Sequence, residues 1–514
     1  MRLKVRLLNI QAGSSNIAIL GGVTASLLGV HSSDRVQIVQ GDKHVVAVVN
    51  VSSSFPRECV GLYEEVSKKM GVAANDEVDV QFAELPESLH YVQAKIRNER
   101  LRKNEIDLII KDVVERHLSD IELASFITAL QVHGLSMDEI EALSRAMAAT
   151  GSSLSLGKQF VLDKHSIGGI PGDKTSILVV PIIAAAGFVI PKTSSRAVTS
   201  PAGTADRVEA LCPVDLSVDE IREVVEKTNG CMVWGGALEL APADDIFIQI
   251  EYPLAIDPML LPSIMSKKKA IGATHVVIDI PTGRGAKIKT IGEAEALADD
   301  FIELGQRLGI NVQCGVTFGE QPLGHAIGPA LEAREALSAI KGNGPADLIE
   351  KALSLAGILF EMVGVKEGKQ KAEELLKSGK AEQKLREIIE AQGGDPRVKV
   401  EDITVGDKRE TVTTTQEGEV LWVSNEDLAK IAKEAGAPKD KGAGVMLRTK
   451  LGDHAKNGEV LFEIYAEREG RLESALNLAK KLQPIGLSKK PEDRMLMSRI
   501  PAPTVRRKAF TFER

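Results

Sequence analysis

The chain has 514 residues, 43% of them hydrophobic and 26% charged, which is typical of a globular protein with about two to four domains. Its net charge of −8 and its aromatic content of 4% argue against a nucleic-acid-binding protein, because phosphate contacts need a basic surface. No stretch approaches the ~18–20 apolar residues of a membrane span, no signal-peptide pattern is present, and the four cysteines are far apart. We therefore expect a cytoplasmic protein with buried thiols and neither a membrane nor a nucleic-acid partner.

Residues 1–87 predict a small β-rich domain. Short β-branched runs are separated by polar turns, and residues 25–38 resemble residues 66–80 in sequence. Each copy is typical of a short helix, a turn and a strand, which indicates an internal duplication in a barrel-like unit. No catalytic grouping is evident there.

Residues 88–160 predict a helical domain. Apolar residues recur at helical spacing around positions 106–114, and Ser119 with Glu122 and Ser136 with Glu139 match capping boxes. We expect helices near residues 258–272 to join this domain.

Residues 164–204 are the most informative stretch. They contain two turns rich in glycine and hydroxyl residues, KHSIGGIPGDKTS and TSSRAVTSPAGT, on either side of a long apolar run. Glycine allows backbone N–H groups to approach an anion closely, and a helix that begins near Asp173 adds its own unpaired N–H groups. Such residues also form ordinary turns, but two such turns within about forty residues favour an anion site.

Residues 161–395 predict an α/β domain with a parallel sheet, because strand, loop and helix alternate after residue 204. The loop PTGRGAK at 281–287 directly follows a strand at 275–280, at the end of a parallel sheet where ligands bind. Residues 396–514 predict a strand-rich C-terminal subdomain with strands near 411–415, 419–423 and 460–465. Its basic tail after residue 484 is expected to be a surface arm.

Several ordered motifs name a family. The pattern KHSxGG…GDxTS, followed by IPKxSxR…GT, QPLG and KGAG, closely resembles the thymidine and pyrimidine nucleoside phosphorylases over residues 93–485. The resemblance implies a helical domain facing an α/β domain across a cleft, in a homodimer or larger homo-oligomer. It also implies cleavage of a glycosidic C1′–N bond by inorganic phosphate as co-substrate. No side-chain cluster has metal-ligand spacing, so we expect no metal and no cofactor.

The chain departs from that family at positions that contact the base or the nucleotide. Its second turn differs from the pyrimidine pattern, and residues 248–252 lack the base-reading arginine. These departures resemble the archaeal AMP phosphorylases, which convert a nucleoside 5′-monophosphate and phosphate into the base and ribose 1,5-bisphosphate. The sequence does not rank AMP against CMP or UMP.

This resemblance assigns the site residues. It implies that Asp257 is the proton donor and that AMP contacts Gly169, Ser195, Arg196, Ala197, Val198, Thr199, Ser200, Thr204, Ser263 and Lys287. It places inorganic phosphate at Lys164, Ser166, Ser176, Ser194 and Thr204.

The chemistry is compatible with these assignments, since phosphorolysis needs a fixed phosphate and an acid that protonates the leaving base. Apolar neighbours of Asp257 predict that burial raises its affinity for a proton, although an Asp before a proline is also a common turn or cap residue. Lys287 is alternatively a strand-edge surface residue. Lys267, Lys268 and Lys269 are expected on a solvated helix face, although Lys267 matches a base-contacting lysine of the pyrimidine phosphorylases. A pyrimidine nucleoside phosphorylase, a phosphoribosyltransferase and a non-catalytic nucleotide-binding protein remain as alternatives.

Overall fold

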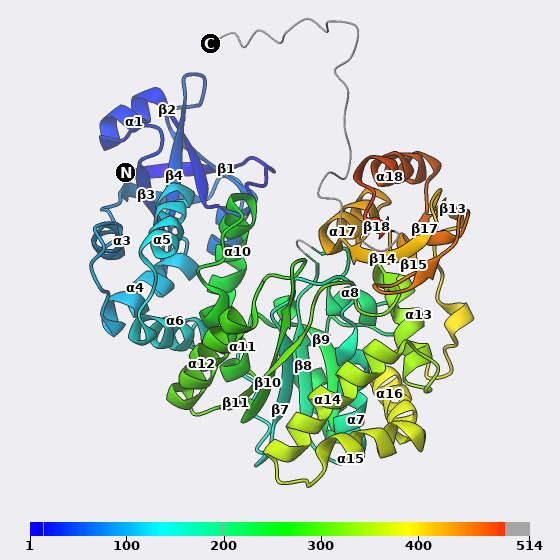
Figure 1. The fold of residues 1–514 in the computed structure, drawn as a ribbon. Helices are drawn as coiled ribbons and strands as arrows, with labels where there is room; N and C mark the ends of the chain where they lie inside the picture. Colours follow the sequence, from blue (N-terminus) through cyan, green and yellow to red (C-terminus); the bar gives the residue numbers. More distant parts are fainter. Residues whose placement is uncertain (14, 198–199, 489–514) are drawn as a thin grey trace, which may run out of the picture.

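The computed structural model describes residues 1–488, except residues 14 and 198–199. Figure 1 shows an N-terminal unit and a C-terminal unit on opposite sides of the molecule, with the α/β domain below them. The expected basic tail and two residues of the second turn, Val198 and Thr199, lie outside the described residues. Within those residues, no helix is both long and apolar enough to cross a membrane.

The N-terminal unit is a closed barrel with the strand order β1-β5-β2-β4-β3-β6. Its strands are β1 (Arg2–Leu7), β2 (Ile17–Gly21), β3 (Arg35–Gln40), β4 (Lys43–Ser52), β5 (Cys59–Leu62) and β6 (Glu77–Phe82), with α1 (Gly22–Leu28) and α2 (Glu64–Met70). The duplication is confirmed: each helix ends at a left-handed glycine, Gly29 or Gly71, and a strand follows. In both copies an aspartate, Asp34 or Asp76, accepts a backbone hydrogen bond in the turn.

The helical domain is built from two separate stretches of the chain. It contains α3 (Ser88–Ile96), α4 (Lys103–Val114), α5 (Asp120–His133) and α6 (Met137–Ala149), which are joined by α10 (Pro242–Leu254) and α11 (Leu260–Ala270). The capping boxes at Ser119 and Ser136 are confirmed. Phe247 of α10 packs on Phe126 of α5 with ring centroids 6.4 Å apart, so α10 belongs to this core.

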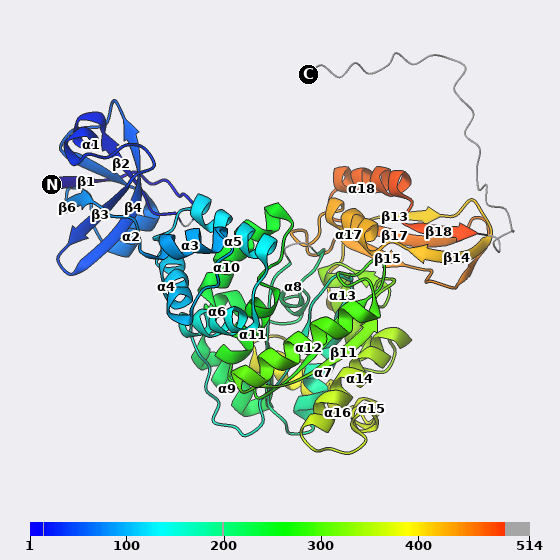
Figure 2. The same ribbon diagram turned by 60° about the vertical axis from the view of Figure 1, so that its left-hand side comes forward.

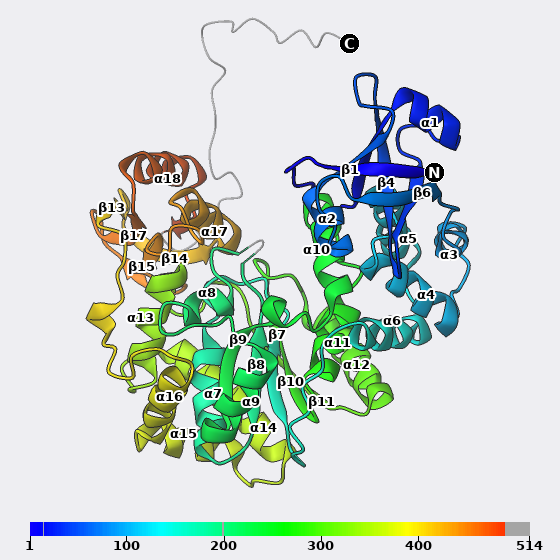
Figure 3. The same ribbon diagram turned by 180° about the vertical axis from the view of Figure 1, so that it is seen from behind.

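The α/β domain contains parallel strands, as predicted. The three strands of the sheet β11-β10-β7 run parallel to one another, and so do the two strands of the sheet β8-β9. The strands are β7 (Leu162–Ser166), β8 (Ile190–Ser194), β9 (Gly230–Trp234), β10 (His275–Thr282) and β11 (Asn311–Phe318). The apolar run forms α7 (Thr175–Ala185), whose residues 175–184 are all buried. The other helices are α8 (Thr204–Val208), α9 (Val218–Thr228), α12 (Ile291–Leu308), α13 (Pro329–Ala339), α14 (Ala346–Met362), α15 (Gly368–Lys377) and α16 (Lys380–Ala391) (Figure 3).

The C-terminal unit contains two small sheets, of order β12-β15-β17-β13 and β16-β14-β18. The strands are β12 (Ala326–Ile327), β13 (Lys408–Thr413), β14 (Gly418–Val423), β15 (Gly444–Leu447), β16 (His454–Ala455), β17 (Val460–Ala466) and β18 (Ile485–Ser488), with α17 (Asn425–Glu434) and α18 (Glu469–Leu482) (Figure 2). The three predicted strands are therefore present. Since β12 comes from the α/β domain, the two units share a sheet.

The cysteines follow the sequence expectation only in part. All four are free, but only Cys212 and Cys231 are buried, whereas Cys59 and Cys314 are partly exposed. The expectation of four buried thiols is wrong for the latter two, because each lies on a strand with a solvent-accessible position.

Candidate active site

A cavity of about 710 Å³ lies between the helical and α/β domains. One wall is formed by α10, α11 and the loop between them. The opposite wall is formed by the carboxyl ends of β7, β8 and β9 and by the loop after β10. This is the edge of a parallel sheet at which ligands bind in α/β proteins.

The second turn enters this cavity through residues 194–197, and side chains around it hold it in place. The Arg196 guanidinium donates two hydrogen bonds to Glu209, at 2.9 and 2.7 Å, and lies 4.8 Å from the centre of the Trp234 ring. The Asp206 carboxylate accepts from the Ala197 backbone N–H at 2.7 Å. Arg196 and Ala197 are therefore held by protein contacts, which reduces the entropic cost of ordering them on binding.

The first turn begins in the cavity wall, which His165 and Ile167 line, and it contains a network of buried ion pairs. Lys164 is 2% exposed, and its Nζ donates to the Thr175 hydroxyl at 2.6 Å and lies 3.5 Å from Asp173. Lys351 joins this group at 2.8 Å from Asp279. Lys164 is thus held by carboxylates and does not line the cavity.

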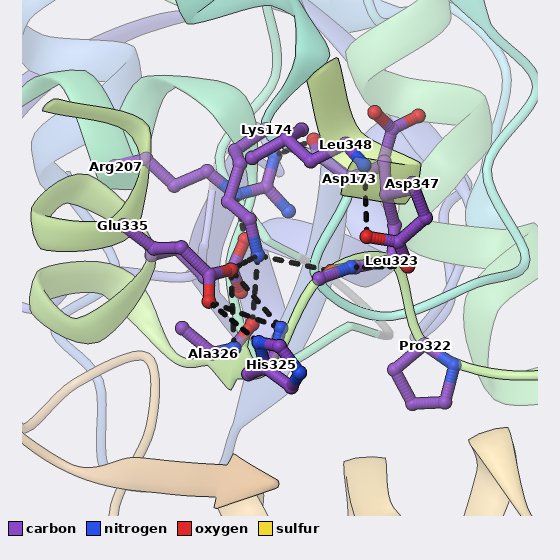
Figure 4. A network of polar contacts seen from close by, with 12 residues as sticks. Asp173, Lys174, Arg207, Pro322, Leu323, His325, Ala326, Glu335, Asp347 and Leu348 are labelled. Carbon is purple, nitrogen blue, oxygen red and sulfur yellow. Dashed lines mark hydrogen bonds and ion pairs between the residues drawn. The ribbon is translucent and has the colours of Figure 1, made fainter. Parts of the chain in front are cut away.

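Lys174, which follows Asp173 in the first turn, is also held by buried contacts. Figure 4 shows its ammonium between the Glu335 carboxylate and the carbonyls of Leu323 and Ala326, to which it donates at 3.0 and 3.1 Å. The carboxylate of Glu335 has its pKa lowered to about 2 by Lys174 and its hydrogen bonds, in spite of burial. These contacts fix the start of α7 against the loop that leads to β12.

At the buried floor of the cavity, two lysines share one carboxylate. Lys268 lines the cavity, and its Nζ lies 2.5 Å from the fully buried Asp163, with which Lys192 also pairs at 3.7 Å. Burial, together with the charges of Lys268 and Lys164, lowers the pKa of Lys192 to about 7, although Asp163 opposes this shift. A buried site with more lysines than carboxylates is suited to an anion.

The expectation of a solvated lysine face is wrong for two of its three residues. Lys268 is 1% exposed, and Lys267 pairs with the buried Asp244 at 2.5 Å. Only Lys269 lies on the exposed side of α11. The partner carboxylates are distant in sequence, so the charge run alone did not indicate burial.

Asp257 and Lys287 meet at a solvent-exposed edge of the cavity. The Lys287 Nζ donates to the Asp257 Oδ2 at 2.8 Å. The side chain of Lys287 is 46% exposed and that of Asp257 is 44% exposed. The expected desolvation of Asp257 is therefore wrong, because the carboxylate lies at the open edge of the cavity. The conformation of Gly169 also depends on this loop, since it has φ +96° and a Cβ there would lie 2.6 Å from the Lys287 backbone nitrogen.

Sequence reasoning missed Glu251, which lines the cavity from the last turn of α10. It is 6% exposed, and burial, followed by the charge of Asp257, raises its pKa to about 7. His165, also in the cavity wall, has its pKa lowered well below the usual value by burial and by surrounding lysines, so it is neutral.

The structure brings some of the predicted site residues together and not others. The cavity is lined by Ser194, Ser195, Arg196, Ala197, Asp257, Ser263 and Lys287. Among the described residues, those that do not line it are Lys164, Ser166, Gly169, Ser176, Ser200 and Thr204. Of these, Gly169 lies against the Lys287 loop, since a Cβ there would be 2.6 Å from the Lys287 backbone nitrogen.

Three segments of the chain match known domain families. Residues 89–151 match the glycosyl transferase family helical bundle domain, residues 158–382 the glycosyl transferase family a/b domain, and residues 420–486 the pyrimidine nucleoside phosphorylase C-terminal domain. A crystal structure of anthranilate phosphoribosyltransferase from Thermus thermophilus shares the fold, with a TM-score of 0.50 and 21% identity over 59% of this chain and 98% of that one.

Curated relatives match almost the whole chain. The AMP phosphorylase of Thermofilum pendens is 49% identical over 97% of this chain and 98% of its own length. The AMP phosphorylase of Thermococcus kodakarensis is 51% identical over 94% of this chain and 97% of its own length.

Proposed function

Because the chain belongs to the AMP phosphorylase family, we propose that it cleaves AMP with inorganic phosphate to give adenine and ribose 1,5-bisphosphate. Other nucleoside 5′-monophosphates are further substrates in this proposal. Inorganic phosphate is the co-substrate, and no metal or cofactor is required. We further propose that the enzyme acts in the cytoplasm as a homodimer or larger homo-oligomer.

The reaction breaks the C1′–N9 bond, whose electron pair goes to adenine, and forms a bond between C1′ and a phosphate oxygen. Adenine gains one proton and hydrogen phosphate loses one, so protons balance. Asp257 at the cavity edge is the proposed acid, in reach of a base bound between α10 and the loop after β10. The exposed Lys287 stabilises the carboxylate that Asp257 becomes.

The observation that carries the proposal is that one cavity combines buried lysines at its floor with a carboxylate–lysine pair at its exposed edge. Lysine charge gathers around Asp163 at the floor, while Asp257 and Lys287 lie at the edge. The floor suits the attacking phosphate, and the anchored second turn suits the nucleotide. Two anions can thus lie on either side of one ribose.

The pyrimidine nucleoside phosphorylase alternative lacks its main recognition group here. Residues 248–252, the stretch in which the family resemblance places a base-reading arginine, contain no arginine, and Ile248, Glu251 and Tyr252 of this stretch line the cavity. The test is phosphate-dependent base release from AMP, CMP, UMP, adenosine, uridine and thymidine. AMP is expected to be cleaved faster than any nucleoside, and faster cleavage of thymidine would refute the proposal.

A further inference from the structure

A closed ring of charged side chains joins the second turn to the C-terminal unit. Arg196 of the turn lies 2.7 Å from the Glu209 carboxylate and 3.5 Å from that of Asp206. Lys441, which lies between α17 and β15, contacts Glu209 as well, and its Nζ is 3.6 Å from Asp206. Each carboxylate therefore lies between the same two cations, and positive and negative groups alternate around the ring.

Asp206 connects this ring to the backbone of the second turn. It is buried, and its Oδ2 accepts hydrogen bonds from the N–H groups of Ala197 at 2.7 Å and Gly203 at 2.9 Å. Arg196 and Ala197 both line the cavity. The position of the part of the turn that faces the cavity thus depends on where the ring holds Asp206.

Lys441 also balances negative charge at this side of the cavity. The hydrogen bonds of Glu209 to Arg196 and Lys441 lower its pKa to about 2, so this carboxyl is ionised at neutral pH. The partly exposed Asp215 lies a further 3.3 Å from Arg196. Without Lys441, three carboxylates would surround the Arg196 guanidinium, and their excess charge would repel a phosphate group.

Backbone contacts hold Lys441 against the α/β domain. Its carbonyl accepts from the Ala330 N–H in the first turn of α13 at 3.1 Å, and the N–H of the next residue, Gly442, donates to the Glu467 carboxylate at 2.8 Å. The Lys441 side chain is 44% exposed, and ion pairs of such side chains contribute little to folding stability. We therefore expect loss of its charge to act locally, on the ring.

We propose that Lys441 is a positioning residue for the second turn: it holds the Glu209 and Asp206 carboxylates so that Arg196 and Ala197 can receive the phosphate group of the nucleotide. Lys441 does not line the cavity, so it acts through the two carboxylates. The proposal rests on the proposed function for the placement of the nucleotide at this turn. It gives the C-terminal unit a direct part in substrate binding.

Lys441→Met removes the charge and keeps most of the length of the side chain. We expect KM for AMP to rise at least about fivefold, because the phosphate group of AMP carries nearly two negative charges. The kcat value should stay within about threefold, since Lys441 does not touch the reacting atoms. Lys441→Arg restores the charge and should keep KM within about twofold. The exposed Lys439→Met is the matched control and should leave KM unchanged.

Two comparisons separate this role from a general loosening of the fold. At ~1 M salt the Debye length is ~3 Å, so the KM ratio between Lys441→Met and the unsubstituted enzyme should shrink to less than about twofold. Adenosine lacks the phosphate group, so its dissociation constant should differ by less than about twofold between the two proteins. Equal losses for AMP and adenosine, or a KM ratio that salt does not change, would overturn the proposal.

Calorimetry of AMP binding without inorganic phosphate gives a readout that does not depend on turnover. The dissociation constant of AMP should rise at least about fivefold in Lys441→Met, and an unchanged value would overturn the role of Lys441. If the unsubstituted enzyme binds AMP but releases no adenine when phosphate is added, the proposed function is refuted. The dissociation constants of the two proteins would still decide the role of Lys441.

Discussion

Asp257→Asn separates proton transfer from folding. The substitution keeps the size of the side chain but removes its proton and its charge. Loss of one general acid costs about 100- to 10,000-fold in rate, which corresponds to about 3–5 kcal/mol in the activation barrier. In the ion pair, the side chain of Lys287 is 46% exposed and that of Asp257 is 44% exposed. Loss of this pair should therefore change the free energy of unfolding by less than about 1 kcal/mol.

The assay is adenine release from AMP at saturating phosphate, together with AMP binding by calorimetry and unfolding by denaturant. We expect turnover to fall by at least about 100-fold while AMP affinity stays within a few-fold. Asp138→Asn, which breaks the ion pair between the exposed Asp138 on α6 and Arg307 on α12, is the matched control and should keep full turnover. Turnover of Asp257→Asn within about threefold of the unsubstituted enzyme would refute the role of Asp257 as the acid.

Other substitutions and conditions test the cavity itself. Asp163→Asn leaves buried lysine charge uncompensated and should lower the free energy of unfolding by about 3–5 kcal/mol; a loss below about 1 kcal/mol in denaturant unfolding contradicts this. Near pH ~8, phosphate binding should take up protons, since the anion favours the charged form of Lys192, whose pKa is about 7, and calorimetry in buffers of different ionisation enthalpy measures this uptake. The pKa of Lys192 in the folded protein, about 7, lies below its unfolded value of 10.5, so between these two values the unfolded chain binds more protons than the folded one. In this pH range Lys192 therefore makes the free energy of unfolding rise with pH. Gly169→Ala should lower kcat/KM for AMP by at least about tenfold through the clash with the Lys287 backbone, whereas Gly168→Ala, which has the same sign of φ and open space, should lower it less.

Local signals in the sequence predicted much of the architecture. Glycines and aspartates in the N-terminal duplication specify the turns directly, and Ser119 and Ser136 cap their helices within four residues. Helix α10 was not apparent, because Phe247 packs into the helical core while Ile248 faces the cavity, so no single apolar face is present.

The parts of the site that the sequence did not predict depend on distant contacts. Lys268 is buried because its partner Asp163 lies 105 residues away, and a run of three lysines is ordinarily solvated. Asp257 has apolar neighbours in sequence, yet the loop after α10 presents its carboxylate at the cavity edge. The burial of Glu251 also depends on the fold, since the Met259 backbone N–H that donates to its carboxyl group comes from the loop after Ala255.

Comparing AMP with adenosine as donors, with and without inorganic phosphate, is the decisive test of the proposed phosphorolysis. Base release is followed by chromatography and the sugar product by phosphorus NMR. The account predicts that AMP is cleaved only with phosphate, that its kcat/KM exceeds that of adenosine by at least about 100-fold, and that the product carries phosphate on both C1 and C5. Equal cleavage of adenosine, or release of adenine from AMP without phosphate, would contradict it.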